Sequence, residues 1–213
     1  MNELATLIRG KIEADGPIPV AHFMQLALQH PEHGYYVKAK PIGEKGDFTT
    51  SPEISQIFGE LLGLWCVDMW RKAGSPEPFV LLELGPGRGT LMEDALRATK
   101  KVKNFHDAMQ LFFMESNNPM RDMQTERCAE QMPQYISAIE ELPKIPAFII
   151  ANEFLDAMPI HQYICKDGVC HERLVGLRED EFIFVEGAPD PLIPLKHKVP
   201  FFEVAPQAIT YVR

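Results

Sequence analysis

The part of this chain that most constrains its fold is a short apolar run followed at once by a glycine-rich turn. Residues 79–82 read FVLL, residues 83–90 read ELGPGRGT, and a helical pattern follows. A continuous apolar run of this length is typical of a parallel strand that is buried on both faces. Gly85, Gly87 and Gly89 let the backbone turn sharply and approach a ligand closely. The segment therefore predicts a strand, a ligand-binding turn and a helix.

Two further apolar runs repeat this plan. Residues 111–114 read LFFM, residues 148–151 read FIIA, and each run ends on polar residues. Strand, loop and helix units in this order predict an α/β fold with a parallel sheet and crossover helices. In such sheets, ligands bind outside the carboxyl ends of the strands. We therefore expect a binding site at the three strand ends, whose polar residues are Glu83, Glu115, Asn152 and Glu153.

The N-terminal third of the chain is mainly helical in pattern. Apolar residues recur at helical spacing over residues 4–12, and a second helix is predicted over residues 19–28. Residues 33–50 contain several glycines and predict a loop or hairpin. Ser51, followed by a proline, is a favourable helix start because serine can cap the first turn. We therefore predict one long helix from Ser51 to about Ala73.

Beyond residue 159 the pattern becomes antiparallel. Asp167-Gly168 is a strong turn signal between two short β runs. The chain as a whole then predicts two parts. Residues 1–75 form a helical lobe that includes the glycine-containing loop. Residues 76–213 form a ligand-binding α/β domain, with an antiparallel hairpin inserted at about residues 160–200.

Charge and hydropathy narrow the possible partners. The chain has 213 residues and a formal net charge of −9, which argues against a nucleic-acid backbone or an anionic membrane surface. No apolar run is long enough to cross a bilayer, and the first residues lack the pattern of a signal or transit peptide. If Met1 is the natural start, we therefore expect the protein to stay in the compartment where it is made.

The four cysteines are too few and too scattered to predict a disulfide framework. Cys165 and Cys170 would lie opposite each other across the predicted hairpin, but in a reducing cytoplasm we expect them to stay unpaired. Together with His171 they offer three metal ligands without a fourth, which makes a poor zinc site. We expect no metal.

The glycine-rich turn departs from two common phosphate-binding patterns. A dinucleotide fingerprint of the form G-x-G-x-x-G would need glycine at position 90, where this chain has Thr90. A Walker A loop would need Gly-Lys followed by Ser or Thr. A nucleoside with a short amino-acid tail therefore fits better than a polyphosphate. Glu115, at the end of the next strand, is then suited to accept hydrogen bonds from both ribose hydroxyls.

Four blocks of sequence resemble the MidA-like methyltransferases, a family of mitochondrial and bacterial assembly factors for respiratory complex I. The blocks read PEHGYY at residues 31–36, GDFTTSPEIS at 46–55, ELGPGRGTL at 83–91 and ANEFLDAMP at 151–159. The resemblance implies a class I methyltransferase fold, which is Rossmann-like, with S-adenosyl-L-methionine as methyl donor. It also implies methylation of a protein arginine side chain, on a complex I subunit of the 49-kDa type. A bacterial member would act in the cytoplasm, and a mitochondrial member would act in the matrix if its natural N-terminus carried a transit peptide.

The resemblance also implies roles for individual residues. The glycine turn and the strand ends are expected to bind the donor, and the loop at residues 47–51 is expected to fold over it as a lid. The implied donor-binding residues are Asp47, Thr50, Ser51, Glu83, Gly85, Gly87, Gly89, Glu115 and Ser116. Physical chemistry alone would make Ser51 a helix cap and Asp47 a loop-forming residue.

Arginine methylation needs groups that hold a protonated guanidinium and accept its proton. Glu153 and Asp156 are three residues apart and would share a face if a helix begins there. We predict that these carboxylates orient the guanidinium and that Asn152 helps through its amide oxygen. The alternative is that the two acids merely favour the start of a helix.

Members of this family are usually much longer, and they continue into further strands that include an Asp-Tyr-Gly segment absent here. We therefore expect part of the C-terminal region to be missing from this chain. Two other functions stay open at this point. One is a complex I assembly chaperone that keeps the donor-binding fold without catalysis. The other is an oxidoreductase with a nucleotide cofactor, against which Thr90 argues.

Overall fold

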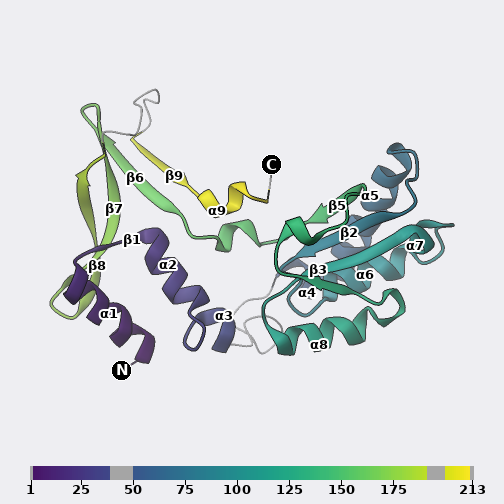
Figure 1. Cartoon of the computed structure of the whole chain (residues 1–213), viewed down its shortest axis with the longest axis horizontal. Helices are drawn as coiled ribbons and strands as arrows, with labels where there is room; N and C mark the ends of the chain where they lie inside the picture. Colours follow the sequence, from purple (N-terminus) through teal and green to yellow (C-terminus); the bar gives the residue numbers. More distant parts are fainter. Residues whose placement is uncertain (1, 39–49, 191–199, 212–213) are drawn as a thin grey trace. The chain divides into compact units, whose positions relative to one another are not determined.

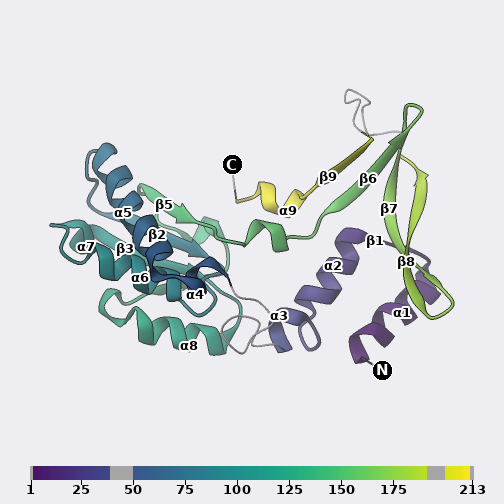
Figure 2. The same cartoon turned by 180° about the vertical axis from the view of Figure 1, so that it is seen from behind.

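The structure is a computed structural model that describes residues 2–38, 50–190 and 200–211 (Figures 1 and 2). The chain divides into two compact units, one of residues Lys40–Leu155 and one of Met1–Ala39 with Asp156–Arg213. This division differs from the boundary predicted at residues 75 and 76. The helices just before the first parallel strand belong with the sheet, and the antiparallel strands belong with the N-terminal helices.

The unit of residues Lys40–Leu155 contains the predicted parallel sheet (Figure 1). Its four strands lie in the order β4-β3-β2-β5, and all of its pairs are parallel. The strands are β2 (Phe79–Leu84), β3 (Met109–Met114), β4 (Gln134–Ile136) and β5 (Ala147–Ile150). All six residues of β2 are buried, as its continuous apolar sequence predicts. Strand β4 was not predicted.

Helices surround this sheet within the same unit. They are α4 (Ser51–Ile54), α5 (Gln56–Lys72), α6 (Thr90–Thr99), α7 (Phe105–Ala108) and α8 (Asn118–Arg127), with short 3-10 helices at Ala129–Gln131 and Ile139–Glu141. The rings of Trp70 in α5, Phe79 in β2 and Phe105 in α7 pack together in the core of this unit. The aromatic cluster joins α5 and α7 to the sheet.

The single helix predicted from residue 51 is interrupted at Ser55. The Ser55 backbone is extended, with φ −151°, and its side chain accepts a hydrogen bond from the Ile57 amide at 3.3 Å. Ser55 therefore caps α5, the longer helix. The prediction that Ser51 is the cap is wrong, because Ser51 is the first residue of α4 and the preceding Thr50 occupies the cap position.

Two glycines let α5 approach α6 closely. A β-carbon built on Gly59 would lie 2.7 Å from the Leu91 carbonyl oxygen, and one on Gly63 would lie 2.7 Å from the Ala95 α-carbon. Glycine is therefore required at both positions for this packing, which holds α6 behind the glycine loop.

Gly63→Ala should lower the free energy of unfolding by about 1–3 kcal/mol, because the added methyl group overpacks a rigid backbone contact. The matched control is Gly10→Ala in a different helix, where an added β-carbon meets nothing within 4 Å and alanine should stabilise by ~0.5–1 kcal/mol. Urea unfolding followed by circular dichroism measures both changes. Equal effects of the two substitutions would contradict the close packing of α5 and α6.

The other unit combines helices with an antiparallel sheet of order β1-β7-β6-β9, in which β8 also pairs with β7. Its elements are α1 (Glu3–Asp15), β1 (Ile18–Pro19), α2 (Val20–Gln29), α3 (Tyr35–Lys38), β6 (His161–Lys166), β7 (Val169–Arg178), β8 (Glu181–Pro189), β9 (Phe201–Val204) and α9 (Pro206–Ile209). The helices predicted over 4–12 and 19–28 and the hairpin with its Asp-Gly turn are confirmed. No helix among the described residues is long and apolar enough to cross a membrane.

Cys165 and Cys170 form a disulfide, with 4.1 Å between their α-carbons. The expectation that they stay unpaired is therefore wrong in this structure. The antiparallel register of β6 and β7 places the two residues directly opposite each other, so their side chains meet on the same face of the hairpin. The remaining cysteines, Cys66 and Cys128, are free and buried.

Candidate functional site

The glycine loop lies at the carboxyl end of β2, at the start of α6. Gly85, Gly87 and Gly89 have φ values of 62°, 53° and 79°, a left-handed conformation that residues with a side chain rarely adopt. The Gly85 amide donates to the Met114 carbonyl at 3.0 Å, and the Gly89 amide donates to the Pro86 carbonyl at 2.8 Å. The predicted turn is confirmed, and its shape depends on glycine at all three positions.

Glu83 is the last acidic residue before this loop, and it is almost fully buried, with 3% of its surface exposed. Its Oε2 atom is buried and has no hydrogen-bond partner. Burial raises the pKa of the Glu83 carboxyl from 4.5 to about 8, because a charged carboxylate is poorly solvated there. Glu83 therefore carries a proton at neutral pH, and it lies beneath the loop as a neutral acid.

Glu115 follows the neighbouring strand β3, so it lies at the same edge of the sheet as Glu83. Its Oε1 accepts from the Asn117 amide at 2.8 Å, and its Oε2 accepts from Gln124 Nε2 at 3.3 Å. Burial raises the pKa of the Glu115 carboxyl, while these two hydrogen bonds act to lower it. Ser116, next to it, is exposed. The Glu115 carboxylate is thus held in a fixed orientation beside the loop.

Two residues of α8 that were not predicted from the sequence also face this site. Gln124 is fully buried, and Nε2 of its amide donates to the Gly87 carbonyl at 2.6 Å. Arg121 donates through Nε to the Glu115 carbonyl at 2.7 Å. Only helical spacing could have identified Gln124, because it shares a buried face with Met120 and Cys128, four residues away on either side.

Glu53, from α4, binds the glycine loop from the other side. It accepts from Thr90 Oγ1 at 2.6 Å and from Arg88 Nη1 at 2.9 Å, and its side chain is only 12% exposed. The guanidinium of Arg88 is therefore paired inside the protein. A loop whose basic side chain is already paired offers no free cation to a polyphosphate.

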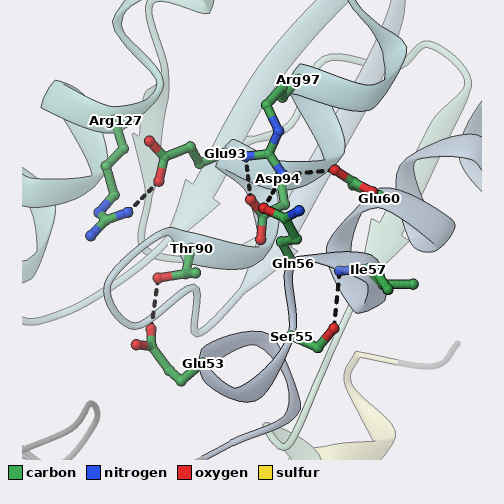
Figure 3. A network of polar contacts seen from close by, with 10 residues as sticks. All are labelled: Glu53, Ser55, Gln56, Ile57, Glu60, Thr90, Glu93, Asp94, Arg97 and Arg127. Atoms are coloured by element: carbon green, nitrogen blue, oxygen red, sulfur yellow. Dashed lines mark hydrogen bonds and ion pairs between the residues drawn. The ribbon is translucent and has the colours of Figure 1, made fainter.

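Figure 3 shows how ion pairs fix α6 behind this loop. Arg97 donates to Glu60 of α5 at 2.8 Å and to the buried Asp94 of its own helix at 2.5 Å. On the other side, Glu93 pairs with Arg127 of α8. Helix α6 is therefore connected to both of its neighbours, and its N-terminal end presents the loop at a fixed position.

The segment after β5 carries the predicted acceptor residues. Asn152 is half-buried and Glu153 is exposed. The predicted helix does not begin at Glu153, because its φ is 49° and only a short 3-10 helix follows, at Leu155–Ala157. The shared helical face proposed for Glu153 and Asp156 is therefore not formed. Phe154, the next residue, would be only 2.7 Å from a β-carbon on Gly85, so this segment packs against the glycine loop.

The predicted lid is described only in part. Asp47 lies outside the described residues. Thr50 is half-buried, and its carbonyl accepts from the amides of Glu53 and Ile54. Ser51 is exposed. The observed contact between this segment and the loop is made by Glu53 instead.

The other unit contains a pocket of about 240 Å³, lined in part by His22 and His161. Nδ1 of His161 and Oε1 of Glu172 are 2.5 Å apart. None of the predicted donor-binding residues lines this pocket. Across residues 2–38, 50–190 and 200–211, no group of three His, Cys, Asp or Glu side chains could hold a metal ion.

Comparison with known proteins agrees with this geometry. Residues 61–212 match the family described as "Putative S-adenosyl-L-methionine-dependent methyltransferase". The chain belongs to this family. This membership confirms the resemblance seen in the sequence blocks and argues against the oxidoreductase alternative.

Several relatives of the chain have names that state an activity. The mitochondrial protein arginine methyltransferase NDUFAF7 homolog of Drosophila melanogaster is 40% identical over 85% of this chain and 48% of its own length. The human protein arginine methyltransferase NDUFAF7, also mitochondrial, is 37% identical over 72% of this chain and 40% of its own length. The chain thus spans about half the length of these curated relatives.

A solved structure shares the fold. It is a Burkholderia thailandensis protein crystallised with S-adenosyl-homocysteine, and it superimposes with a TM-score of 0.77 at 23% identity. The match covers 98% of this chain and 57% of that one. The predicted α/β methyltransferase fold, with its parallel and antiparallel parts, is confirmed.

Glu83 should make the stability of the ligand-free protein depend on pH. The folded protein keeps a proton that the unfolded chain loses above a pKa of 4.5. The free energy of unfolding should therefore fall as the pH rises from about 4.5 to about 8. Glu83→Gln removes this titration, so it should raise the melting temperature relative to wild type at pH 8 and change it little at pH 5.

Thermal unfolding of both proteins at the two pH values measures this difference. Glu126→Gln, at an exposed position on α8, is the control. It should change the melting temperature by the same small amount at pH 5 and at pH 8. An equal shift of the melting temperature in Glu83→Gln at pH 5 and pH 8 would contradict the conclusion that Glu83 is a buried, neutral carboxyl.

Proposed function

We propose that this chain binds S-adenosyl-L-methionine and transfers its methyl group to an arginine side chain of a protein. The observation that carries the proposal is the placement of the Glu115 carboxylate beside a glycine loop whose only charged side chain, Arg88, is already paired with Glu53. A carboxylate held by hydrogen bonds suits the hydroxyls of a ribose, and a loop without a free cation suits a nucleoside that lacks phosphates better than a polyphosphate.

The residues present fit this donor. Added β-carbons at Gly85 and Gly89 would lie 2.7 Å and 3.3 Å from their nearest neighbours. Glycine at these positions therefore lets the loop pack closely against the neighbouring residues at the strand ends. Glu115 would bind the ribose hydroxyls, and the exposed Ser116 would lie beside them. When bound, the donor supplies an electrophilic methyl group on a sulfonium centre. The protein must then orient the acceptor and exclude water.

Support for arginine as the acceptor comes from the names of the relatives, which are protein arginine methyltransferases. In this chain the amide oxygen of Asn152 and the carboxylate of Glu153 lie two residues and one residue before Phe154, which packs on the loop. We assign them, with Asp156, to hold the guanidinium, which stays protonated in solution. A carboxylate of this group would also accept the proton released on methylation.

The partner we propose is a complex I subunit of the 49-kDa type. The compartment we propose is the one in which complex I is assembled, the mitochondrial matrix or the bacterial cytoplasm. The names of the relatives support the mitochondrial location.

The donor assignment predicts selective binding by the purified chain. Titration calorimetry should show binding of S-adenosylhomocysteine and none of NAD. Glu115→Ala should weaken binding at least tenfold, because the hydrogen bonds to the ribose are charge-assisted and each is worth about 1.5–3 kcal/mol. Glu126→Ala, exposed on α8, should leave it unchanged. Tight NAD binding, or an unaltered affinity in Glu115→Ala, would contradict the assignment.

The acceptor assignment predicts a different pattern. Combined Glu153→Ala and Asp156→Ala should abolish methyl transfer to a recombinant complex I subunit of the 49-kDa type, while the affinity for S-adenosylhomocysteine changes less than about threefold. Transfer of a labelled methyl group, with mass spectrometry of the product, measures this. Glu179→Ala and Asp180→Ala, both exposed in the turn before β8, together form the control.

Loss of donor binding in the double variant would reassign these acids to the donor site. Donor binding by the wild-type chain without any methyl transfer would favour an assembly chaperone instead.

A further inference from the structure

Gln124 is a buried polar residue of α8 to which the proposed donor binding and methyl transfer assign no role. None of its surface is exposed, and its neighbours on the same helical face, Met120 and Cys128, are also buried. A fully buried side chain cannot touch a ligand directly. Any role of Gln124 in the site must therefore act through the groups to which it is bonded.

Those groups are two parts of the proposed donor site. Nε2 of Gln124 donates to the Gly87 carbonyl at 2.6 Å and to Oε2 of Glu115 at 3.3 Å. One amide therefore links the glycine loop after β2 with the carboxylate after β3. Gly89 packs on the same residue, since a β-carbon there would lie 3.3 Å from the Gln124 α-carbon.

The orientation of this amide is determined by its surroundings. Both contacted atoms are acceptors, so only the NH₂ group can face them. The consequence is that Oε1 of Gln124 is buried without a hydrogen-bond partner. An unsatisfied buried acceptor is unfavourable, and methionine, with a similar shape, would avoid it. The amide is thus a poor choice for packing alone, and its value lies in the two groups that it joins.

The other contacts of Glu115 also hold it in a fixed position. The Asn117 amide binds the other carboxylate oxygen at 2.8 Å, and Arg121 binds the Glu115 carbonyl. Gln124 supplies the only one of these contacts that also reaches the glycine loop. We propose that Gln124 is a positioning residue that sets the distance and orientation of the Glu115 carboxylate relative to the loop, so that the donor meets a preformed site. This inference rests on the proposed function.

The test compares stability with donor affinity. Gln124→Met removes the side-chain NH₂ group and the unpaired carbonyl oxygen, and it keeps the shape of the side chain. Its melting temperature should equal or exceed that of wild type, whereas its dissociation constant for S-adenosylhomocysteine should rise about tenfold, the loss expected for one hydrogen bond to a charged group. Gln131→Met is the matched control, since its amide contacts His106 instead, and it should leave the affinity unchanged.

Gln124→Asn is the second variant, because it keeps an amide but is too short to reach both acceptors. It should also weaken donor binding, and it keeps the inference testable if Gln124→Met fails to fold. A lower melting temperature with unchanged affinity in either folded variant would overturn the proposal, because it would show a purely structural role.

A second measurement needs no ligand and separates this inference from the proposed function. Carbon-detected NMR titration of the Glu115 carboxyl should show a higher pKa in Gln124→Met than in wild type, because a hydrogen bond that favours the carboxylate is lost. If wild type binds no S-adenosylhomocysteine, the proposed function fails, and this titration still decides whether Gln124 positions Glu115. An unchanged pKa would overturn the inference.

Discussion

The glycine loop after β2 has three residues in a left-handed conformation, and such a backbone keeps one shape only when the surrounding structure fixes it. Three elements from distant parts of the sequence do so. Glu53 of α4 binds Thr90, Gln124 of α8 binds the Gly87 carbonyl, and Phe154 after β5 packs on Gly85. The proposed donor site therefore depends on the whole unit of residues Lys40–Leu155.

The described ionisable groups around this loop leave no positive charge unpaired. Glu83 is neutral through burial, the Arg88 charge is offset by Glu53, and the Glu115 carboxylate accepts hydrogen bonds that include those from the Asn117 amide and Gln124. The loop thus presents no unpaired cation to a ligand, and its neighbouring ionisable group is an acid. This environment suits a sulfonium nucleoside and disfavours a polyphosphate.

The features that can be predicted from the sequence are those with a strong local signal. Continuous apolar runs locate β2, β3 and β5, glycine spacing locates the loop, and the Asp-Gly turn locates the hairpin of β6 and β7. Strand β4 has only three residues and one buried side chain, too little for a periodic pattern. The break at Ser55 rests on a local cap, the hydrogen bond from the Ile57 amide, but the favourable helix start at Ser51 conceals it. The hairpin places Cys165 opposite Cys170, but no local pattern records whether the two thiols are oxidised. The hydrogen bonds from Gln124 to the Gly87 carbonyl and to Glu115 join α8 to the ends of two strands, so no local pattern predicts them.

The central claim is that the donor lies between the glycine loop and the Glu115 carboxylate. The most direct measurement is a map of backbone amide chemical shifts on adding S-adenosylhomocysteine to the purified, isotope-labelled chain. We expect the largest changes at Gly85, Gly87, Gly89 and residues 115–117, and small changes in the turn between β7 and β8. Changes centred on the antiparallel sheet, or no changes in a folded sample, would contradict the claim.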